Sequence, residues 1–398
     1  MDFAPQQDQA LRAIDYWFKN RTKEQPIFRL FGFAGTGKTT LAKHIAANID
    51  GLVIFAAFTG KATHVLKMKG CPVTSTIHQL IYAPREKGQA RLRDLQSQLV
   101  REKTKKDASP KRVKELEELI AAEQANLRRP SWTLKSESEL RKAKLLIVDE
   151  ASMVDQPMGE DLLSFGVPIL ALGDPGQLAP IKGTGFFTNV KADFLLTDIH
   201  RQARDNPIIE MSRIVREGGF LRLGQYGSSE VVDGRQFQRD WVFSADQILV
   251  GKNDTRKSYN ARIRELSGAA QPLPSLGDKL VCLRNNHDVG LLNGSLWRVD
   301  GPALDTGDGQ VYLELLGEEG QRIVTSAHAC YFHGGEPEWY EKKEADEFDY
   351  GYALTVHKSQ GSQWDKVLVI DEWKRQDHKQ WLYTAITRAA ESVRVVKM

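Results

Sequence analysis

Residues 32–39 are Gly32-Phe33-Ala34-Gly35-Thr36-Gly37-Lys38-Thr39, which fits the pattern G-x-x-x-x-G-K-[ST]. An apolar run precedes this stretch and a helix-like run follows it, which is the strand–loop–helix setting that the pattern needs. The glycines let successive backbone N–H groups face one anion, and Lys38 supplies a charge for phosphate groups. Thr39 offers a hydroxyl to Mg²⁺. The stretch therefore predicts a phosphate-binding loop.

Four runs in the first half of the chain, at residues 26–31, 52–58, 145–148 and 167–172, are apolar nearly throughout instead of alternating. Strands buried on both faces of a parallel sheet have this pattern. Because helix-like stretches lie between the runs, the sequence predicts an open α/β sheet with helices on both faces.

Two carboxylates, Asp149 and Glu150, come directly after the third of these runs. In the same sheet as the loop, Asp149 is expected to hold Mg²⁺ through its water shell. Glu150 is expected to orient and deprotonate an attacking water. The alternative is an acidic pair that only caps the next helix. A base inside the site favours hydrolysis of the nucleotide over simple switching.

An insertion interrupts the first sheet between residues 84 and 130, where 13 Lys/Arg and 8 Asp/Glu give a local net charge of +5. Apolar residues recur there at helical spacing, and Ser109-Pro110 separates two such runs as a helix cap and first turn would. We expect two antiparallel helices. The alternatives are a solvated pair without a partner and a basic surface that contacts nucleic acid.

A second α/β block is predicted from buried runs at residues 247–251, 366–372 and 392–397. Residues 277–334 interrupt this block with alternating apolar residues and turn signals such as Asn293-Gly294. That pattern predicts a small antiparallel β module, expected to be a barrel.

Composition excludes several classes of protein. The 398 residues are 41% hydrophobic and 27% charged, and no run of 18 apolar residues exists, so no membrane helix is expected. The N-terminus lacks the pattern of a secretory signal, and three distant cysteines form no disulfide framework, which favours the cytoplasm. The net charge of +3 is too small to indicate nucleic acid by itself.

Short motifs follow one another in a fixed order along the chain. They are residues 7–10 (QDQA), 58–62 (FTGKA), 76–80 (TIHQL), 149–152 (DEAS), 173–180 (GDPGQLAP), 200–202 (HRQ), 352–362 (YALTVHKSQGS) and 382–389 (LYTAITRA). Together with the phosphate loop they resemble superfamily 1 helicases, and within them the RecD-like and Dda-like helicases of subclass B. Each later motif alone is weakly specific, whereas the ordered set is very specific.

The resemblance implies an α/β protein with two RecA-like P-loop domains that hold ATP between them. The expected units are domain 1A (residues 1–82 and 131–193), a helical insertion 1B (83–130), domain 2A (194–276 and 335–398) and an SH3-like β-barrel insertion 2B (277–334). Well-known relatives carry a β-hairpin pin that splits the duplex in the first insertion. Here that stretch is expected to be helical, so no pin residue is carried over.

The same resemblance implies a set of ATP contacts. Gln7 would recognise adenine, Gln177 would sense the γ-phosphate, and Arg201 and Arg388 would be arginine fingers from the second domain. The expected catalytic set is Lys38, Glu150, Gln177, Arg201 and Arg388. The alternative for either arginine is a surface ion pair, which is the more frequent role of an arbitrary arginine. The remaining expected nucleotide contacts are Gly35, Thr36, Gly37, Thr39, Thr40 and Gly361.

Single-stranded DNA is the expected polymer, bound through phosphate contacts that carry no sequence information. The resemblance assigns these contacts to Thr59, Lys61, Thr76 and His78 in the first domain and to His357, Lys358 and Ser359 in the second. A histidine such as His78, taken alone, is more often structural. Aromatic residues are expected to stack under the bases.

The leading hypothesis is an ATP- and Mg²⁺-dependent DNA helicase that moves 5′ to 3′ on single strands, with the polarity taken from the resemblance alone. The alternatives are a protein-displacing translocase with weak unwinding and a non-hydrolysing nucleotide-dependent switch. Expected partners are single-stranded DNA, single-strand–duplex junctions, and single-strand-binding, replication or recombination proteins. We expect a monomer in the cytoplasm, or in the host cytoplasm if the chain is phage-encoded.

Overall fold

The first sheet has six parallel strands in the order β3-β2-β6-β7-β1-β8. The strands are β1 (Ile27–Gly32), β2 (Val53–Ala57), β3 (Thr74–Thr76), β6 (Leu145–Asp149), β7 (Ile169–Gly173) and β8 (Phe194–Leu196). Every residue of β2 and β7 is buried. This confirms the expectation that the apolar runs form strands covered on both faces.

Helices cover both faces of this sheet. They are α1 (Pro5–Asn20), α2 (Lys38–Ala47), α3 (Gly60–Met68), α4 (Ile77–Ile81) and α7 (Gln156–Leu163). Phe55 packs with Ile14 of α1 and Leu41 of α2, whereas its neighbour Ile54 packs with Leu162 of α7. Because successive strand residues point to opposite faces, the two clusters are the two sides of one layered core.

The computed structural model describes residues 3–84, 90–105, 109–128, 132–179, 185–198, 206–269, 272–286, 289–318, 320–336 and 345–398. Among these residues no helix is long and apolar enough to cross a membrane. Short 3₁₀ turns occur at η1 (Glu139–Lys142), η2 (Ala151–Met153), η3 (Gly234–Gln236), η4 (Ala329–His333) and η6 (Val356–Ser359).

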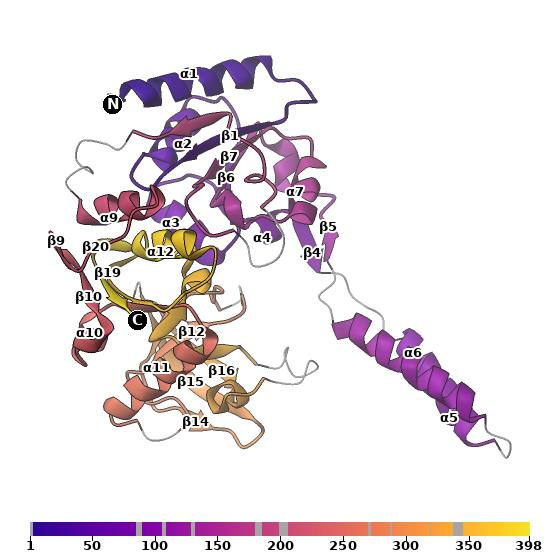
Figure 1. The fold of residues 1–398 in the computed structure, drawn as a ribbon. Coiled ribbons are helices and arrows are strands. Elements are labelled where there is room, and N and C mark those ends of the chain that lie inside the picture. Colours follow the sequence, from indigo (N-terminus) through magenta and orange to yellow (C-terminus); the bar gives the residue numbers. More distant parts are fainter. Residues whose placement is uncertain are drawn as a thin grey trace.

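The first insertion is a helical arm, as predicted. It consists of α5 (Ala90–Lys103) and α6 (Pro110–Arg128), and it rises from an antiparallel ribbon of β4 (Tyr82–Pro84) and β5 (Trp132–Leu134). Leu95 and Leu116 are buried although most of the arm is exposed. Figure 1 shows the arm projecting away from the body of the protein.

The second sheet has the order β18-β11-β19-β20-β10-β9, and all its strands are parallel except the edge strand β9. The strands are β9 (Gly224–Tyr226), β10 (Ser229–Asp233), β11 (Gln247–Val250), β18 (Ala353–Thr355), β19 (Trp364–Asp371) and β20 (Ala389–Lys397). Its helices are α9 (Pro207–Arg216), α10 (Trp241–Ser244), α11 (Asn253–Leu266) and α12 (His378–Ile386). The predicted second α/β block is confirmed.

A third, antiparallel sheet forms the β module. Its strands are β12 (Lys279–Cys282), β13 (Leu296–Val299), β14 (Leu304–Asp305), β15 (Gln310–Gly317), β16 (Arg322–His328) and β17 (Phe348–Tyr350). β17 lies beyond the predicted end of the module at residue 334 and pairs with β12. β8 likewise extends the first sheet past residue 193 by pairing with β1. The SH3-like character of the module stays a prediction.

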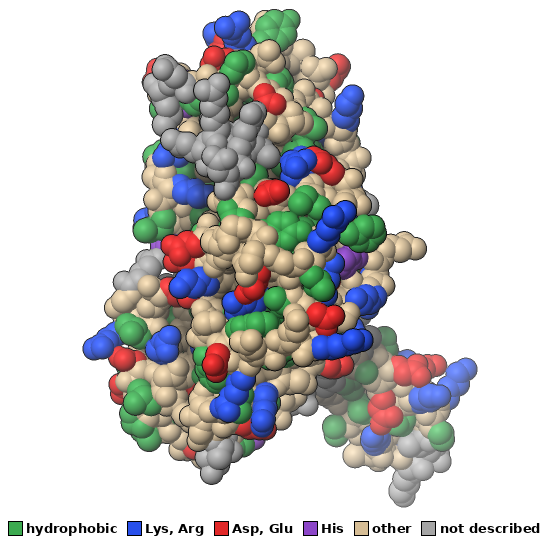
Figure 2. All heavy atoms as spheres, turned by 60° about the vertical axis from the view of Figure 1, so that its left-hand side comes forward, with side chains coloured by type: hydrophobic (Ala, Val, Ile, Leu, Met, Phe, Trp, Pro, Cys, Tyr) green, Lys and Arg blue, Asp and Glu red, His purple; other side chains and the backbone are tan. Residues whose placement is uncertain are grey.

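The surface mixes charges of both signs. Figure 2 shows Lys and Arg interspersed with Asp and Glu over the face that it presents. This face therefore shows no single large patch of one charge sign.

Candidate functional site at the seam between the two parallel sheets

The phosphate-loop candidate connects the end of β1 to the start of α2. Gly35 and Gly37 have φ angles of 79° and 83°, in the left-handed region that glycine adopts without strain. The Lys38 Nζ donates to the backbone oxygens of Gly32 (2.6 Å) and Phe33 (3.1 Å). The loop thus folds back on the side chain of Lys38, which is the first residue of α2.

A cavity of about 290 Å³ lies directly over this loop. Its lining includes Gly35, Gly37, Lys38, Thr39, Thr40, Asp149, Glu150, Gln177 and Arg388. Most of the expected nucleotide contacts therefore meet at one place. Arg388 comes from the second α/β block, so the cavity lies between the two parallel sheets.

Glu150 is held in an unusual conformation. Its φ is 51° and its ψ is 44°, and it is the only non-glycine residue with positive φ in the described ranges. A left-handed conformation costs an L-residue about 1–2 kcal/mol, and such strain concentrates at functional sites. Removal from water raises the pKa of the Glu150 carboxyl, while the charges of Arg388 and Lys38 oppose that rise.

Gln177 connects Glu150 to Arg388. In the amide orientation that satisfies both neighbours, its nitrogen donates to Glu150 Oε2 (3.1 Å) and its oxygen accepts from Arg388 Nη2 (3.2 Å). Arg388 Nη1 lies 3.9 Å from Glu150 Oε1. A predicted base, a predicted sensor and a predicted finger are thus in mutual contact.

Arg388 lies between α12 and β20, directly before the first residue of β20. It is 5% exposed. Its Nε donates to the oxygen of Thr384 (3.2 Å) and its Nη1 to that of Ser362 (3.3 Å). These contacts hold the guanidinium in one position, which suits a group that acts by orientation.

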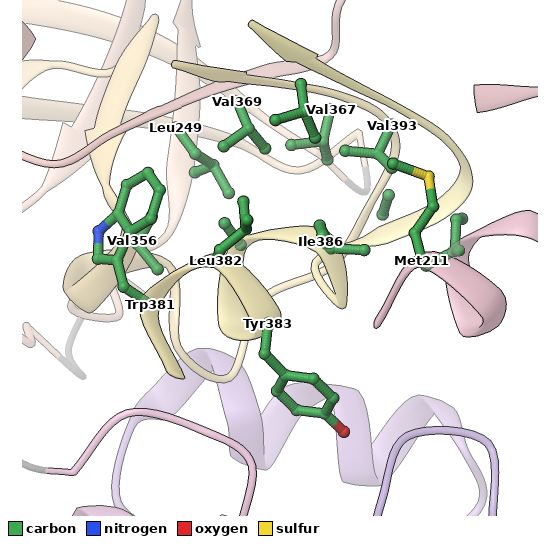
Figure 3. Close-up of a cluster of buried hydrophobic side chains, with 14 of the residues drawn as sticks. Met211, Leu249, Val356, Val367, Val369, Trp381, Leu382, Tyr383, Ile386 and Val393 are labelled. Carbon is green, nitrogen blue, oxygen red and sulfur yellow. The ribbon is translucent and has the colours of Figure 1, made fainter. Parts of the chain in front are cut away.

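Tyr383 is a seam residue that sequence reasoning missed. Its hydroxyl donates to Asp174 Oδ2 (2.8 Å) and accepts from the backbone N–H of Ala34 in the phosphate loop (3.0 Å). Figure 3 shows Tyr383 on the side of α12 opposite to Leu382, with its ring directed away from the other labelled apolar side chains. Burial and Asp174 raise the pKa of this hydroxyl, so it stays protonated. Its place in the 382–389 motif was the available signal.

Further contacts join the seam. The Leu178 N–H donates to Thr384 Oγ1 (2.9 Å), and Gln360 Nε2 donates to the oxygen of Leu178 (3.0 Å). The guanidinium carbon of Arg216, in α9, lies 3.8 Å from the centre of the Phe33 ring in the loop. Sequence reasoning missed this stacking pair because no local motif marks Arg216.

Three expected nucleotide contacts do not line the cavity. Gln7 is buried and donates through Nε2 to the oxygen of Thr36 (3.1 Å), so it contacts the back of the loop. The Thr36 hydroxyl donates to the oxygen of Phe33 (2.8 Å) within the loop. Gly361 packs against Thr59 and α3 at a positive φ of 76°. Arg201, the remaining expected finger, lies outside the described residues with its neighbours 199–205.

The expected DNA contacts spread over several surfaces. Thr59 caps α3 and Thr76 caps α4, each through its side-chain oxygen. His78 contacts the rings of Phe58 and Tyr82, and burial lowers the pKa of its imidazole. Thr76 is buried, so its side chain stabilises the helix start and has little surface left for a strand.

Of the three second-domain residues expected to contact DNA, His357 alone lines a groove shared by both α/β blocks. This groove has a volume of about 750 Å³ and is also lined by Ser152, Leu178, Thr355 and Trp373. The His357 and Trp373 rings lie 5.8 Å apart. Burial lowers the pKa of His357, so its imidazole is neutral near pH 7.

Two expected DNA contacts lie elsewhere. Lys358 lines a separate cavity of about 710 Å³ with Arg256 and Asp349. Ser359 is fully buried and donates to the oxygen of Val356 (2.8 Å). Ser359 therefore stabilises the η6 turn and offers no surface to a polymer in this arrangement.

Lys61 is held by the β module. Its Nζ lies 3.1 Å from Glu318 Oε2 and 4.8 Å from the centre of the Trp364 ring. Leu292, also in the module, packs so closely on Gly60 that an added Cβ would lie 2.8 Å from it. The module thus covers the start of α3, where two of the expected DNA contacts lie.

Mg²⁺ suits the donors of the loop cavity. Asp149 and Thr39 line it together, and Asp149 Oδ1 accepts the Glu150 N–H (2.9 Å), which orients the carboxylate. A hydroxyl, one carboxylate and the phosphates of a substrate form a set that Mg²⁺ accepts in nucleotide sites. In the described ranges no group of three His, Cys, Asp or Glu side chains forms an all-protein metal cage.

Comparison with known proteins gives two family matches. Residues 4–235 match the family described as AAA domain, and residues 350–396 match the UvrD-like helicase C-terminal domain. The ATP-dependent RecD2 DNA helicase of Deinococcus radiodurans is 27% identical over 278 residues, which cover 62% of this chain and 35% of that protein. The ATP-dependent DNA helicase dda of Enterobacteria phage T4 is 28% identical over 218 residues, which cover 51% of this chain and 39% of the phage protein. The chain thus spans little more than a third of the length of these two relatives.

Solved structures share the fold at low identity. The crystal structure of Pif1 helicase from Bacteroides in complex with ADP-AlF3 and ssDNA has a TM-score of 0.53 at 16% identity, covering 99% of this chain and 92% of that one. Pif1 helicase from Candida albicans has a TM-score of 0.52 at 18% identity, with 100% and 94% coverage. The arrangement of two parallel sheets around a seam is therefore shared with these helicases.

Proposed function

Because the chain belongs to the AAA-domain family and continues into a UvrD-like helicase C-terminal domain, as superfamily 1B helicases do, we propose that it is an ATP-dependent DNA helicase. It hydrolyses Mg-ATP between its two RecA-like domains, moves 5′ to 3′ on single-stranded DNA and unwinds duplex at junctions. The observation that carries this proposal is the contact of Glu150 and Gln177 with Arg388 above the phosphate loop.

The roles follow from the chemistry of the seam. Lys38 and the backbone N–H groups of the loop hold the phosphates. Thr39 and Asp149 would hold Mg²⁺, which would neutralise part of the phosphate charge. Glu150 orients the attacking water and takes its proton, and Gln177 senses the γ-phosphate. Arg388 stabilises the charge that spreads over the transferred phosphoryl oxygens, for which a planar guanidinium is suited.

Movement requires that the two domains hold DNA differently in different nucleotide states. Tyr383 and Gln177 support this requirement, since each forms hydrogen bonds from its own wall of the seam to the other. Closing on ATP would tighten these contacts, and hydrolysis would release them. The groove that contains His357 and Leu178 opens between the same two walls, so a change at the seam alters its width.

The first test compares hydrolysis and unwinding on 5′-tailed and 3′-tailed duplexes. The proposal predicts hydrolysis that single-stranded DNA accelerates strongly, and unwinding of the 5′-tailed substrate alone. Lys38→Ala should abolish hydrolysis and retain some DNA binding. Equal rates of ATP hydrolysis with and without single-stranded DNA would contradict the proposal that the protein moves along DNA.

The second candidate is a translocase that displaces proteins but unwinds duplex poorly. The helical arm favours this candidate because the arm stands where well-known relatives have the hairpin pin that splits the duplex. Displacement of streptavidin from a biotinylated strand, compared with unwinding of a fork, separates the two. Absence of turnover with any DNA would instead favour a nucleotide-dependent switch.

A further inference from the structure

The positive charge of the arm is concentrated at its tip. Residues 101–115 contain seven Lys or Arg and three Asp or Glu, a net charge of +4 out of the +5 for residues 84–130. These residues are the end of α5, the connection and the start of α6. The rest of the arm is nearly balanced, so the tip differs from the shaft in charge as well as in position.

Three cations at the tip are unpaired in the described part of the chain. Three other cations at the tip have acidic partners. The ion pairs are Lys103–Glu117, Lys105–Glu102 and Arg112–Glu115. Arg101, Lys111 and Lys114 are exposed and form no ion pair with a described residue. Exposed cations without an acid to neutralise them are the groups that phosphate backbones recruit.

The arm is held firmly at its root. The Tyr82 hydroxyl donates to Asp161 Oδ2 on α7 (2.5 Å), and the Lys135 N–H donates to the oxygen of Ile81 (2.8 Å). Among the described side chains of the arm, Leu95 and Leu116 are buried, and Leu92, Leu99, Val113 and Ile120 are half-buried. Val100 and Leu119 are exposed, and single exposed apolar residues need no partner. The arm is therefore a spacer with a charged end and not an apolar docking face.

The root also fixes what the tip can reach. α4, which carries His78, continues directly into β4, so the arm begins beside the expected path of the single strand. α5 has 14 residues and is about 20 Å long. The tip thus lies well beyond the surface of the first domain, as Figure 1 shows. We therefore expect a strand held on the body to fall short of the tip and a duplex leaving the body to reach it.

We propose that the tip of the α5–α6 arm binds the phosphate backbone of duplex DNA at a single-strand–duplex junction. This inference rests on the proposed function and adds to it a second DNA contact, remote from the seam. The arm grips the backbone without separating the strands. Duplex is favoured over a protein partner because the tip offers surplus positive charge and little apolar surface.

The test reverses the three unpaired charges in one variant, Arg101→Glu, Lys111→Glu and Lys114→Glu. Two of these positions lie in the first turns of α6, where an acid suits the helix dipole, so the arm should still fold. The matched control reverses three exposed cations on the body, Lys23→Glu, Arg235→Glu and Arg239→Glu. Binding of labelled single strand, blunt duplex and 5′-tailed fork is measured without nucleotide over a range of salt concentrations.

The arm variant should lose about tenfold in affinity for duplex and fork, and the slope of log affinity against log salt should fall by about 2–3. Its affinity for the single strand should equal that of the control. Unchanged fork affinity and slope would overturn the proposal and favour a protein partner. Equal losses on single strand and fork would overturn it as well.

A second variant removes the arm. Pro84 and Trp132 face each other in the β4–β5 ribbon, so a short Asn-Gly turn can join them in place of residues 85–131. This variant should keep single-strand-stimulated hydrolysis and lose the preference for forks; retention of that preference would contradict the proposal. A wild-type protein without such hydrolysis would instead refute the proposed function, while leaving the duplex-binding result intact.

Discussion

Tyr383 ties the two domains through one oxygen atom, which bonds Asp174 and the Ala34 N–H. Tyr383→Phe should lower the free energy of unfolding by about 1–2 kcal/mol, since two hydrogen bonds are lost. It should also reduce the acceleration of hydrolysis by single-stranded DNA, measured as the ratio of stimulated to basal rates. Tyr352→Phe is the matched control, because Tyr352 donates to Asp278 away from the seam. An unchanged ratio in Tyr383→Phe would contradict a coupling role.

Glu150 combines function with backbone strain. Replacing it by Gly should relieve the left-handed conformation, so Glu150→Gly should be more stable than Glu150→Ala by about 1 kcal/mol. Both variants should lack ATP hydrolysis. Thermal unfolding of the two proteins gives the comparison, and equal stability would show that the conformation stores no strain.

The raised pKa of Glu150 has a kinetic consequence. Only the deprotonated carboxylate can accept a proton, so hydrolysis should fall as pH drops through that pKa, at a higher pH than for an ordinary glutamate. Because Arg388 opposes the rise, Arg388→Gln should move the acidic limb of the pH–rate profile further upward. The measurement is the stimulated rate against pH in both proteins, and an Arg388→Gln limb at the wild-type pH or below it would contradict this electrostatic account.

The β module contacts α3 near the expected DNA path. Glu318 neutralises Lys61, and Leu292 packs on Gly60. Glu318→Gln should free Lys61 for phosphate and raise affinity for single-stranded DNA several-fold at low salt. Glu265→Gln is the control, because Glu265 pairs with Arg262 on the exposed side of α11. Weaker binding by Glu318→Gln would show that the pair supports the DNA site.

Elements were predictable from sequence where the pattern is local. Continuous apolar runs gave β2, β6, β7 and β19, and the helical period gave α5 and α6. Contacts between distant segments were not predictable, because no periodicity marks them. The β-module contacts of Lys61, the stacking of Arg216 on Phe33 and the burial of Ser359 depend on how separate elements pack.

At the scale of the whole molecule, the ordered motifs predicted that two α/β blocks meet at one seam. The loop, Asp149, Glu150 and Gln177 form one wall, and Arg388 forms part of the other. The motifs did not predict how DNA contacts divide among the groove, the β module and the arm. That division depends on insertions whose sequences follow no motif. The assignments to DNA therefore stay predictions for all seven residues, Thr59, Lys61, Thr76, His78, His357, Lys358 and Ser359.

The most direct test of the seam is ATP hydrolysis by Arg388→Lys at saturating single-stranded DNA. A lysine keeps the charge but cannot reproduce the planar fork, and loss of an arginine finger costs about 10³-fold or more in rate. The account predicts such a loss, with ATP still bound and with the protein still folded at the assay temperature, as thermal unfolding can verify. Hydrolysis at the wild-type rate would contradict a site completed across the two domains.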